Sequence, residues 1–327
     1  MSLNRRDLLL GACAAPLLAH PLSALAQSLD LAKIIVGFPA GGGVDLVARR
    51  VAEKLRPAYA KAVVVDNRPG AGGQIAVSAV KAAPADGSSL LLTPMTILAI
   101  YPHTYKKLPY DPVADLVPVS RVVSFGFGVA VGPSVPASVT TVPELMAWFR
   151  ANPGQANYGT AAAGSTMNFI GDLLARAAKT EVRHVPYRGS QLAIQDMMGG
   201  QVPAVVAPLG ELTPHLKGDR ARLLATTGAS RSRFFPQTPT LGEQGFAEMD
   251  LTEWHGLFAP ANTPADTVSR LNSAVRAALA QADVVEALAA QSFEVAPTSP
   301  AELRSLLARD TQLWGRLVTS TGFKPEG

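Results

Sequence analysis

Two short stretches of small residues have the composition of anion-binding loops. The first, FPAGGGVD, spans residues 38–45, and the second, YGTAAAGST, spans residues 158–166. Each follows a strand-like apolar run and opens a helical pattern. The first N–H groups of a helix have no intrahelical partner and carry partial positive charge, so they bind anions where small side chains permit approach. One such stretch is equally compatible with a tight turn, but two matching stretches favour a small anion held between them.

Nucleotide cofactors do not fit these glycines. A dinucleotide fingerprint that starts at Gly41 needs a further glycine at the position of Leu46. A P-loop needs a lysine directly after its last glycine, and Val44 follows the glycines here. We therefore expect no phosphate cofactor, and indeed no cofactor at all.

Catalytic and metal-binding patterns are also missing from the sequence. No GxSxG elbow occurs, since Pro136 replaces the last glycine after Ser134, and there is no HExxH motif. Four histidines follow the first 26 residues, none at metal-ligand spacing, and we expect them at turns or in packing: His103, His184, His215 and His255. The sequence predicts neither a catalytic residue nor a metal site.

Several polar residues near the loops have two interpretations. Ser165 is expected to cap the helix that begins at Thr166 or to contact a ligand, rather than to act as a nucleophile. Asp45 is first a candidate helix cap and second a ligand contact. Arg188 either reaches the far end of a ligand or remains in solvent. Trp254 is expected to pack between lobes rather than to stack on a ligand.

The elements that position the loops alternate between strands and helices. Strand-like runs at 34–38, 62–65 and 90–93 are separated by helical patterns at 44–55 and 74–82. The runs are continuously apolar, which is typical of a parallel sheet covered on both faces. This βαβαβ order predicts an α/β domain with right-handed crossovers.

A second α/β series begins after a change of composition at residues 131–145. Its predicted helices lie at 142–149, 166–178 and 191–198. One short strand is predicted to end at residues 157–158, and further strands lie at 182–185, 202–206 and 223–226. Helical patterns then fill 264–281, 284–291 and 300–320, a tail that we expect to pack on the first domain. The sequence thus predicts a discontinuous first lobe (27–127 plus 251–327) and a second lobe (128–250).

The first 26 residues have the features of an export signal. Arg5 and Arg6 precede a short apolar run, and an Ala-Leu-Ala sequence that ends at Ala26 resembles a cleavage site. Sec and Tat export remain open, as does the less favoured alternative of a lipid attached to Cys13, the only cysteine. These features predict a protein exported to the periplasm.

Composition limits the class of protein further. The chain has 327 residues, 48% of them hydrophobic and 17% charged, so it is long and apolar enough for two folded domains. The net charge of +4 is small, and no basic stripe with interleaved aromatic residues is present. Nucleic-acid binding is therefore not expected.

An ordered set of motifs resembles the Bug family, the periplasmic binding proteins of tripartite tricarboxylate transporters. The motifs include FPAGGGVD, VVVDNRPGAGGQIA, LPYDPVADLVPVS, NYGTAAAGS, VPYRGSQLAIQDMMGGQV, PTLGEQGF and WHGLFAPANTP. The resemblance implies a two-lobed α/β Venus-flytrap fold of the type II-like periplasmic-binding-protein class, with a ligand cleft between the lobes. It also implies capture of a small carboxylate, such as a di- or tricarboxylate or an aromatic acid, for membrane permease subunits.

The resemblance also implies which residues surround the ligand. In the first lobe these are Phe38, Ala40, Gly41, Gly42, Gly43, Asp45, Met95 and Thr96, and in the second Tyr158, Thr160, Ala161, Ala162, Gly164, Ser165, Thr166, Tyr187, Arg188 and Ala207. The chain departs from the family pattern at Ala162, Asn168, Pro203 and Ala207. A side chain at Gly42 is expected to block the ligand and to strain the backbone.

The predicted function is therefore solute binding by a periplasmic monomer, without chemistry. A sensory protein that presents its ligand to a membrane receptor is an alternative that the residues do not exclude. An enzyme acting on a small organic acid is the third possibility, although no base–nucleophile pair supports it.

Overall fold

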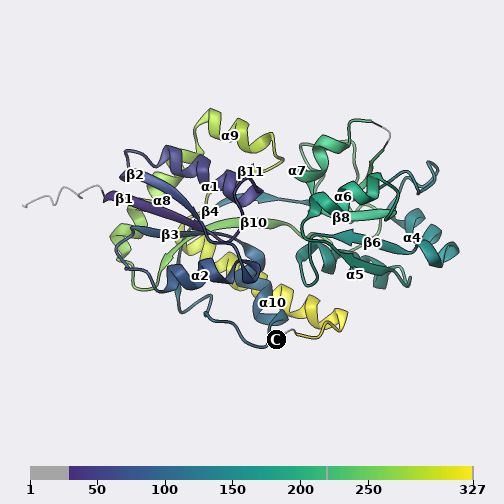
Figure 1. Cartoon of the computed structure of the whole chain (residues 1–327), viewed down its shortest axis with the longest axis horizontal. Coiled ribbons are helices and arrows are strands. Elements are labelled where there is room, and N and C mark those ends of the chain that lie inside the picture. The colour runs from purple at the N-terminus through teal and green to yellow at the C-terminus, as the bar shows by residue number, and fades with distance from the viewer. Residues whose placement is uncertain (1–28, 219, 326–327) are drawn as a thin grey trace, which may run out of the picture.

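Two mixed β-sheets, each covered by helices on both faces, make up the protein (Figure 1). The computed structural model describes residues 29–218 and 220–325, so the predicted export signal lies outside the described residues. We call the first sheet with its covering helices the first lobe, and the second sheet with its helices the second lobe.

The first sheet has six strands in the order β11-β4-β10-β3-β1-β2. Its strands are β1 (Leu29–Val36), β2 (Ala60–Asn67), β3 (Ser89–Pro94), β4 (Leu116–Phe125), β10 (Glu253–Pro260) and β11 (Glu294–Val295). The predicted parallel pairing is confirmed for β1 with β2 and β3. The sequence predicts no pairing for the other half of the sheet, where β10 runs antiparallel to both of its neighbours, β3 and β4.

The second sheet has five strands in the order β7-β6-β8-β5-β9. Its strands are β5 (Phe127–Val131), β6 (Asn157–Thr160), β7 (Arg183–Pro186), β8 (Ala204–Pro208) and β9 (Arg222–Thr226). Strand β6 is parallel to β7 and β8, whereas β5 is antiparallel to β8 and β9.

Helices cover both faces of the first sheet because alternate strand residues point to opposite sides. Ile34 belongs to a core shared with α1 (Gly43–Lys54), α8 (Ala265–Leu279) and α9 (Ala282–Ala289). Its neighbour Ile35 belongs to a core shared with α2 (Gln74–Lys81) and α10 (Pro300–Thr321). In the second lobe, α4 (Val142–Ala151) and α5 (Thr166–Ala177) contribute to the same core as α10, and α6 (Ser190–Met198) and α7 (Leu209–Leu212) to a third.

The two lobes are connected by strands that lead from one sheet to the other, and one helix contacts both lobes. Gly126 alone separates β4 in the first sheet from β5 in the second, and β10 carries the chain back. The predicted packing of the C-terminal helices on the first lobe is confirmed, since α10 lies on β4 and on the short π-helix η2 (Thr96–Ile100). Helix α10 also reaches the second lobe, where Trp314 contacts Phe169 of α5 with ring centroids 5.9 Å apart.

Candidate functional site

The first loop, residues 37–42, joins β1 to α1 and exposes bare backbone. Pro39 through Gly43 are exposed, whereas Val44, Val47 and Val51 anchor α1 in the core. Gly42 is the N-cap of α1, and no side chain in the described ranges caps this helix end. Among the described residues, no protein acceptor takes the N–H groups of Gly42, Gly43 and Val44. The helix therefore presents free donors and the positive end of its dipole to the exterior.

The special backbone angle in this loop belongs to Gly41. Its φ is +86°, a region in which a side chain is strained. Gly42 has an ordinary φ of −78°, so the expected backbone strain of a Gly42 side chain is wrong. A Cβ at Gly42 would lie 3.6 Å from the Pro39 carbonyl oxygen, an ordinary contact. The lack of a side chain at Gly42 therefore leaves the helix end open, although the backbone there would also accept a side chain.

Asp45, in the first turn of α1, fixes the shape of the first loop from the buried side. Its carboxylate is nearly fully buried and accepts hydrogen bonds from Gly41 N–H (2.9 Å), Arg49 Nε (2.8 Å) and Asn67 Nδ2 (2.9 Å). Burial acts to raise its pKa, but the donors, led by Arg49, hold the pKa of Asp45 below its ordinary value. The predicted capping role of Asp45 is wrong, because Gly42 is the N-cap and no side chain in the described ranges caps α1. Both oxygens of Asp45 are occupied by the protein, and the side chain positions the loop instead of facing outward.

The second loop, residues 161–165, joins β6 to α5 with the same design. Ser165 is the N-cap of α5: its Oγ accepts from Asn168 N–H (3.3 Å) and donates to the Ala162 carbonyl (2.8 Å). The predicted capping role of Ser165 is therefore confirmed. In the described part of the chain, the N–H groups of Thr166 and Met167 have no protein acceptor. Gly164 has a φ of +66°, which favours glycine at the turn.

A buried polar network supports the second loop. Asn168 Oδ1 accepts from Gly164 N–H (3.0 Å), and Asn168 Nδ2 donates to Tyr158 Oη (3.0 Å) and to Asp172 Oδ2 (2.9 Å). Tyr158 Oη in turn donates to Asp172 Oδ1 (2.7 Å). Burial and the neighbouring Asp172 raise the pKa of Tyr158, so the phenol stays a donor. These contacts fix the direction of the backbone that precedes α5.

A buried carboxyl group, Glu253, connects the two lobes beside the loops. Glu253 Oε1 accepts from Thr96 N–H (3.0 Å) and from Thr96 Oγ1 (2.6 Å), and Glu253 Oε2 lies 2.8 Å from Thr166 Oγ1. The two threonine hydroxyl oxygens are 2.9 Å apart. Burial raises the pKa of Glu253, whereas the hydrogen bonds from the threonines oppose the rise. Thr96 follows β3 in the first lobe, and Thr166 begins α5 in the second.

Most of the predicted site residues fall into two groups by their exposure. Those exposed or partly exposed on the loops are Phe38, Ala40, Gly41, Gly42, Gly43, Ala161, Ala162 and Ser165. Those buried in the protein are Asp45, Met95, Tyr158, Thr160, Gly164, Thr166 and Ala207. Ala207, for example, is fully buried in β8 and belongs to the core beneath α6, and Thr160 Oγ1 lies 2.7 Å from His184 Nε2. Thr96 is half-buried, with its hydroxyl on Glu253.

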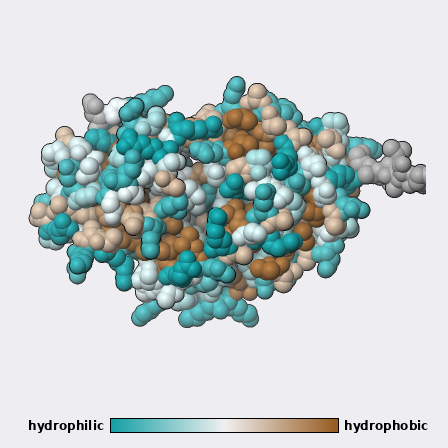
Figure 2. All heavy atoms as spheres, turned by 180° about the vertical axis from the view of Figure 1, so that it is seen from behind, coloured by the Kyte–Doolittle hydropathy of each residue, from teal (hydrophilic) through white to brown (hydrophobic). Residues whose placement is uncertain are grey.

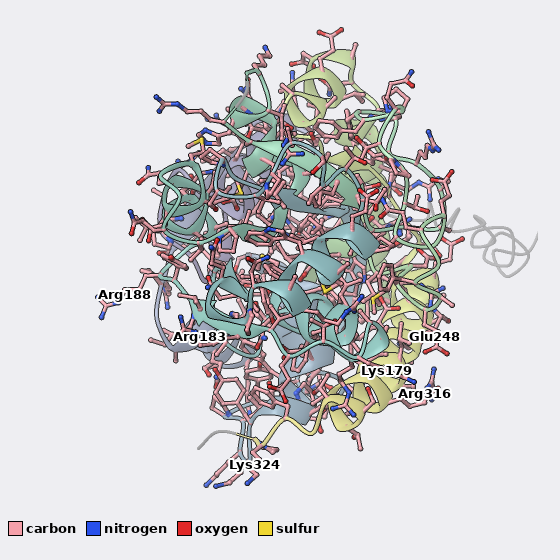
Figure 3. The ribbon with its side chains drawn as sticks, turned by 90° about the vertical axis from the view of Figure 1, so that its right-hand side faces the viewer. Lys179, Arg183, Arg188, Glu248, Arg316 and Lys324 are labelled. Carbon is pink, nitrogen blue, oxygen red and sulfur yellow. The ribbon has the colours of Figure 1, made fainter. Side chains whose placement is uncertain are left out.

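The backbone around Tyr187 and Arg188 lies beside the second loop, since Tyr187 N–H donates to the Thr160 carbonyl (2.9 Å) and Gly189 N–H to the Ala161 carbonyl (3.2 Å). Tyr187 Oη donates to Asp196 Oδ2 of α6 (2.8 Å), and burial with this hydrogen bond raises the pKa of Tyr187 to about 12. Arg188 is exposed and projects outward at the edge of the second lobe (Figure 3). Arg188 was predicted either to reach the far end of a ligand or to remain in solvent, and the structure shows it in solvent.

The histidines have protein contacts, as predicted. Trp254 is also packed, but its hydrogen bond lies within the first lobe and not between the lobes, where its packing was predicted. His255 is buried between Phe125 and Phe293, and burial lowers its pKa to about 3. Trp254 Nε1 donates to Asp310 Oδ2 (2.7 Å), which places the indole between β10 and α10. Sequence reasoning missed Glu253, Asn67 and Asp172. A carboxyl group inside an otherwise apolar run was the one available signal for Glu253.

The surface is mixed in polarity. Seen from behind, hydrophilic residues interrupt the apolar ones over both lobes (Figure 2). The exposed large hydrophobic residues come from several segments: Leu31, Val64, Ile75, Val113 and Leu192. Within residues 29–218 and 220–325, no helix combines the length and the apolar character needed to cross a bilayer.

Comparison with known proteins identifies the family. Residues 47–323 match the tripartite tricarboxylate transporter family receptor, TctC. BugT of Bordetella pertussis is 32% identical over 308 residues, with 94% of each chain covered. A protein encoded in the tcbD-tcbE intergenic region of a Pseudomonas species is 34% identical over 285 residues, covering 87% of this chain and 84% of that protein.

Solved structures share the fold. R. palustris Rpa4515 with adipate has a TM-score of 0.82 at 30% identity, covering 90% of this chain and 98% of that one. MatC from Rhodopseudomonas palustris with bound malate has a TM-score of 0.77 at 26% identity, covering 88% and 98%. The predicted two-lobed binding-protein fold is thus confirmed, and the chain belongs to the tripartite tricarboxylate transporter family of receptors, as a solute-binding protein.

Proposed function

We propose that this receptor captures a small carboxylate between its first and second loops and passes it to a membrane permease. The observation that carries the proposal is the pair of open helix N-termini, α1 from the first lobe and α5 from the second. Each lacks protein acceptors for its first N–H groups among the described residues, and each follows an exposed loop of small residues. A carboxylate has two oxygens with which to accept from both ends.

Backbone donors are sufficient for useful affinity. A hydrogen bond to a charged group contributes about 1.5–3 kcal/mol, and a helix terminus adds about 0.3–2 kcal/mol. About five such bonds, less the cost of ordering the loops, reach the ~8 kcal/mol of a micromolar ligand. No cationic side chain is required, which agrees with the position of Arg188 in solvent.

Two relatives favour a dicarboxylate as the first class to test. The adipate-bound and malate-bound structures are similar to this chain along most of its length. We propose that one carboxylate of such a ligand meets the loops and that the rest of the molecule lies between the lobes, in the site formed by the residues that the sequence predicts.

We further propose that the ligand is bound without chemistry, by a monomer in the periplasm. The lobes would comprise residues 27–127 with 251–327, and residues 128–250. A ligand that contacts both loops favours the closed arrangement, since only that arrangement makes both sets of contacts.

A thermal-shift screen followed by calorimetry tests the proposal. The panel would contain adipate, malate, citrate, benzoate and aspartate, with adipamide as the uncharged counterpart of adipate. A ligand at about 100 times its dissociation constant adds ~2.7 kcal/mol to the free energy of unfolding. We expect at least one carboxylate to stabilise the protein and adipamide to have no effect. Equal stabilisation by adipate and adipamide would contradict recognition by anion-binding loops.

A further inference from the structure

Three short oxygen–oxygen contacts form a closed ring around Glu253. The ring runs from Glu253 Oε1 to Thr96 Oγ1 (2.6 Å), on to Thr166 Oγ1 (2.9 Å), and back to Glu253 Oε2 (2.8 Å). Each distance is that of an O–H···O hydrogen bond, so each contact needs one proton. The two threonines supply only two.

The missing proton belongs to the carboxyl group. With Glu253 ionised, one of the three contacts has no proton and brings two lone pairs together. With Glu253 protonated, Oε2–H donates to Thr166, Thr166 donates to Thr96, and Thr96 donates to Oε1, so every contact is satisfied. We propose that Glu253 is a protonated positioning residue, whose hydrogen-bonded ring ties the N-terminus of α5 to the first lobe.

The surrounding charges favour the neutral form. No cationic side chain in the described ranges forms an ion pair with Glu253, which is 4% exposed. On α10, the like charge of Asp310 disfavours ionisation of Glu253. Arg309 and Arg121 act on Asp310, and Trp254 donates to it. On β10 itself, burial keeps His255 neutral. Burial of Glu253 without a counter-charge is consistent with the bound proton.

The ring positions groups that the proposed function uses. Thr166 is the first residue of α5, directly after the second loop, so the ring fixes where the open end of this helix lies relative to β3 and η2. The effect on ligand affinity rests on the proposed function, whereas the protonation state does not.

Glu253→Gln is the matched variant. The glutamine oxygen accepts from Thr96 as Oε1 does, and its NH₂ group donates to Thr166 as the protonated Oε2 does, so the ring closes without a titratable proton. Asp310→Asn is the control, because Asp310 is the neighbouring carboxyl whose pKa burial also raises.

Infrared difference spectroscopy at neutral pH reads the proton directly. Wild type and Asp310→Asn should both show the C=O stretch of a protonated carboxylic acid that Glu253→Gln lacks. Absence of this band from the wild-type minus Glu253→Gln difference spectrum would overturn the proposal.

The pH dependence of unfolding provides a second readout. Because the pKa of Glu253 is raised above its ordinary value of 4.5, wild type should lose stability as pH rises from that value through the folded-state pKa. Glu253→Gln should lack this component. An identical pH profile in wild type and variant would contradict the proposal.

Ligand affinity is measured last, with adipate and malate as probes. If either binds, its dissociation constant should rise by about tenfold on ionisation of Glu253 in wild type and stay constant in Glu253→Gln. Equal pH dependence in both proteins would show that the ring does not position the site. If neither probe binds, the proposed function fails for these ligands, while the infrared and unfolding results still decide the state of Glu253.

Discussion

At the scale of single residues, the polar side chains near the site face inward and leave the backbone to face outward. Asp45 and Asn168 use their side-chain atoms to hold Gly41 and Gly164, one glycine in each loop. The residues that remain exposed on the loops are mostly glycine and alanine. In the proposed site, polar side chains therefore act on the ligand through the shape of the backbone.

Ser165→Ala tests this indirect action. The variant removes the N-cap of α5 and the bond to the Ala162 carbonyl, so we expect a loss of about 0.5–2 kcal/mol in the free energy of unfolding. Urea denaturation measures the loss, with Ser299→Ala at the cap of α10 as a matched control for capping alone. Both variants should destabilise, but only Ser165→Ala should weaken ligand binding. Equal binding by the two would show that the cap does not shape the site.

The sequence predicted the two loops better than the distant residues that hold them in place. The glycines and the cap at Ser165 are local features, so their spacing alone reveals them. Glu253 meets Thr96 across 157 positions and Thr166 across 87, and only the folded arrangement brings them together. Asp45 was predicted near the helix start, but its partner Asn67 lies 22 residues away on β2.

At the scale of elements, both loops follow strands that have parallel neighbours. Strand β1 lies between β2 and β3, and β6 between β7 and β8, so each loop leaves the carboxyl end of an interior strand. Ligands of α/β proteins bind at such ends. The periodicity of the sequence predicted α1 and α5, whereas β10 was missed. All eight of its residues are buried and show no alternation, and strand order depends on contacts that no local pattern encodes.

Asp45→Asn tests whether the connection from α1 to β2 shapes the first loop. The amide of the variant would keep one acceptor but lose the charge and the second oxygen, so we expect a loss of about 1–3 kcal/mol in stability and weaker ligand binding. Because the pKa of Asp45 is lowered, its contribution is present above the ordinary value of 3.8 and is lost as pH falls below it. The variant should therefore lose less stability than wild type on acidification.

Denaturation at several pH values measures this difference. Asp66→Asn is the control, since Asp66 forms only a partly exposed ion pair with Arg68 (2.8 Å) and should change stability by less than about 1 kcal/mol. Unchanged binding and stability in Asp45→Asn would show that Asp45 does not shape the first loop.

At the scale of the whole molecule, one crossing between the lobes lies beside a cavity, while α10 and the Glu253 ring connect the lobes elsewhere. Gly126 is the single residue between β4 and β5. A cavity of about 130 Å³ lies beside it, lined on the first lobe by Ser124 and Ser292 and on the second by Thr227. The lobes are thus not packed against each other at this point, in contrast to the contacts that α10 and Glu253 make between them.

Small-angle scattering tests closure of the two lobes. Addition of a confirmed ligand should reduce the radius of gyration, because a ligand that contacts both loops stabilises the closed arrangement. A non-binding analogue such as adipamide provides the control. An unchanged radius with bound ligand would place the site on one lobe or show that the lobes are already closed.

Calorimetry on two variants tests the central claim, that backbone N–H groups hold the carboxylate. Gly42 has an ordinary φ and space for a Cβ, so Gly42→Val should fold while its side chain covers the end of α1. Arg188 is exposed and directed into solvent, so Arg188→Ala should retain most of the affinity. With the tightest ligand of the carboxylate screen, we predict no detectable heat of binding for Gly42→Val and a near-wild-type dissociation constant for Arg188→Ala. The reverse result, binding by Gly42→Val and none by Arg188→Ala, would contradict the claim and assign the anion to an arginine clamp.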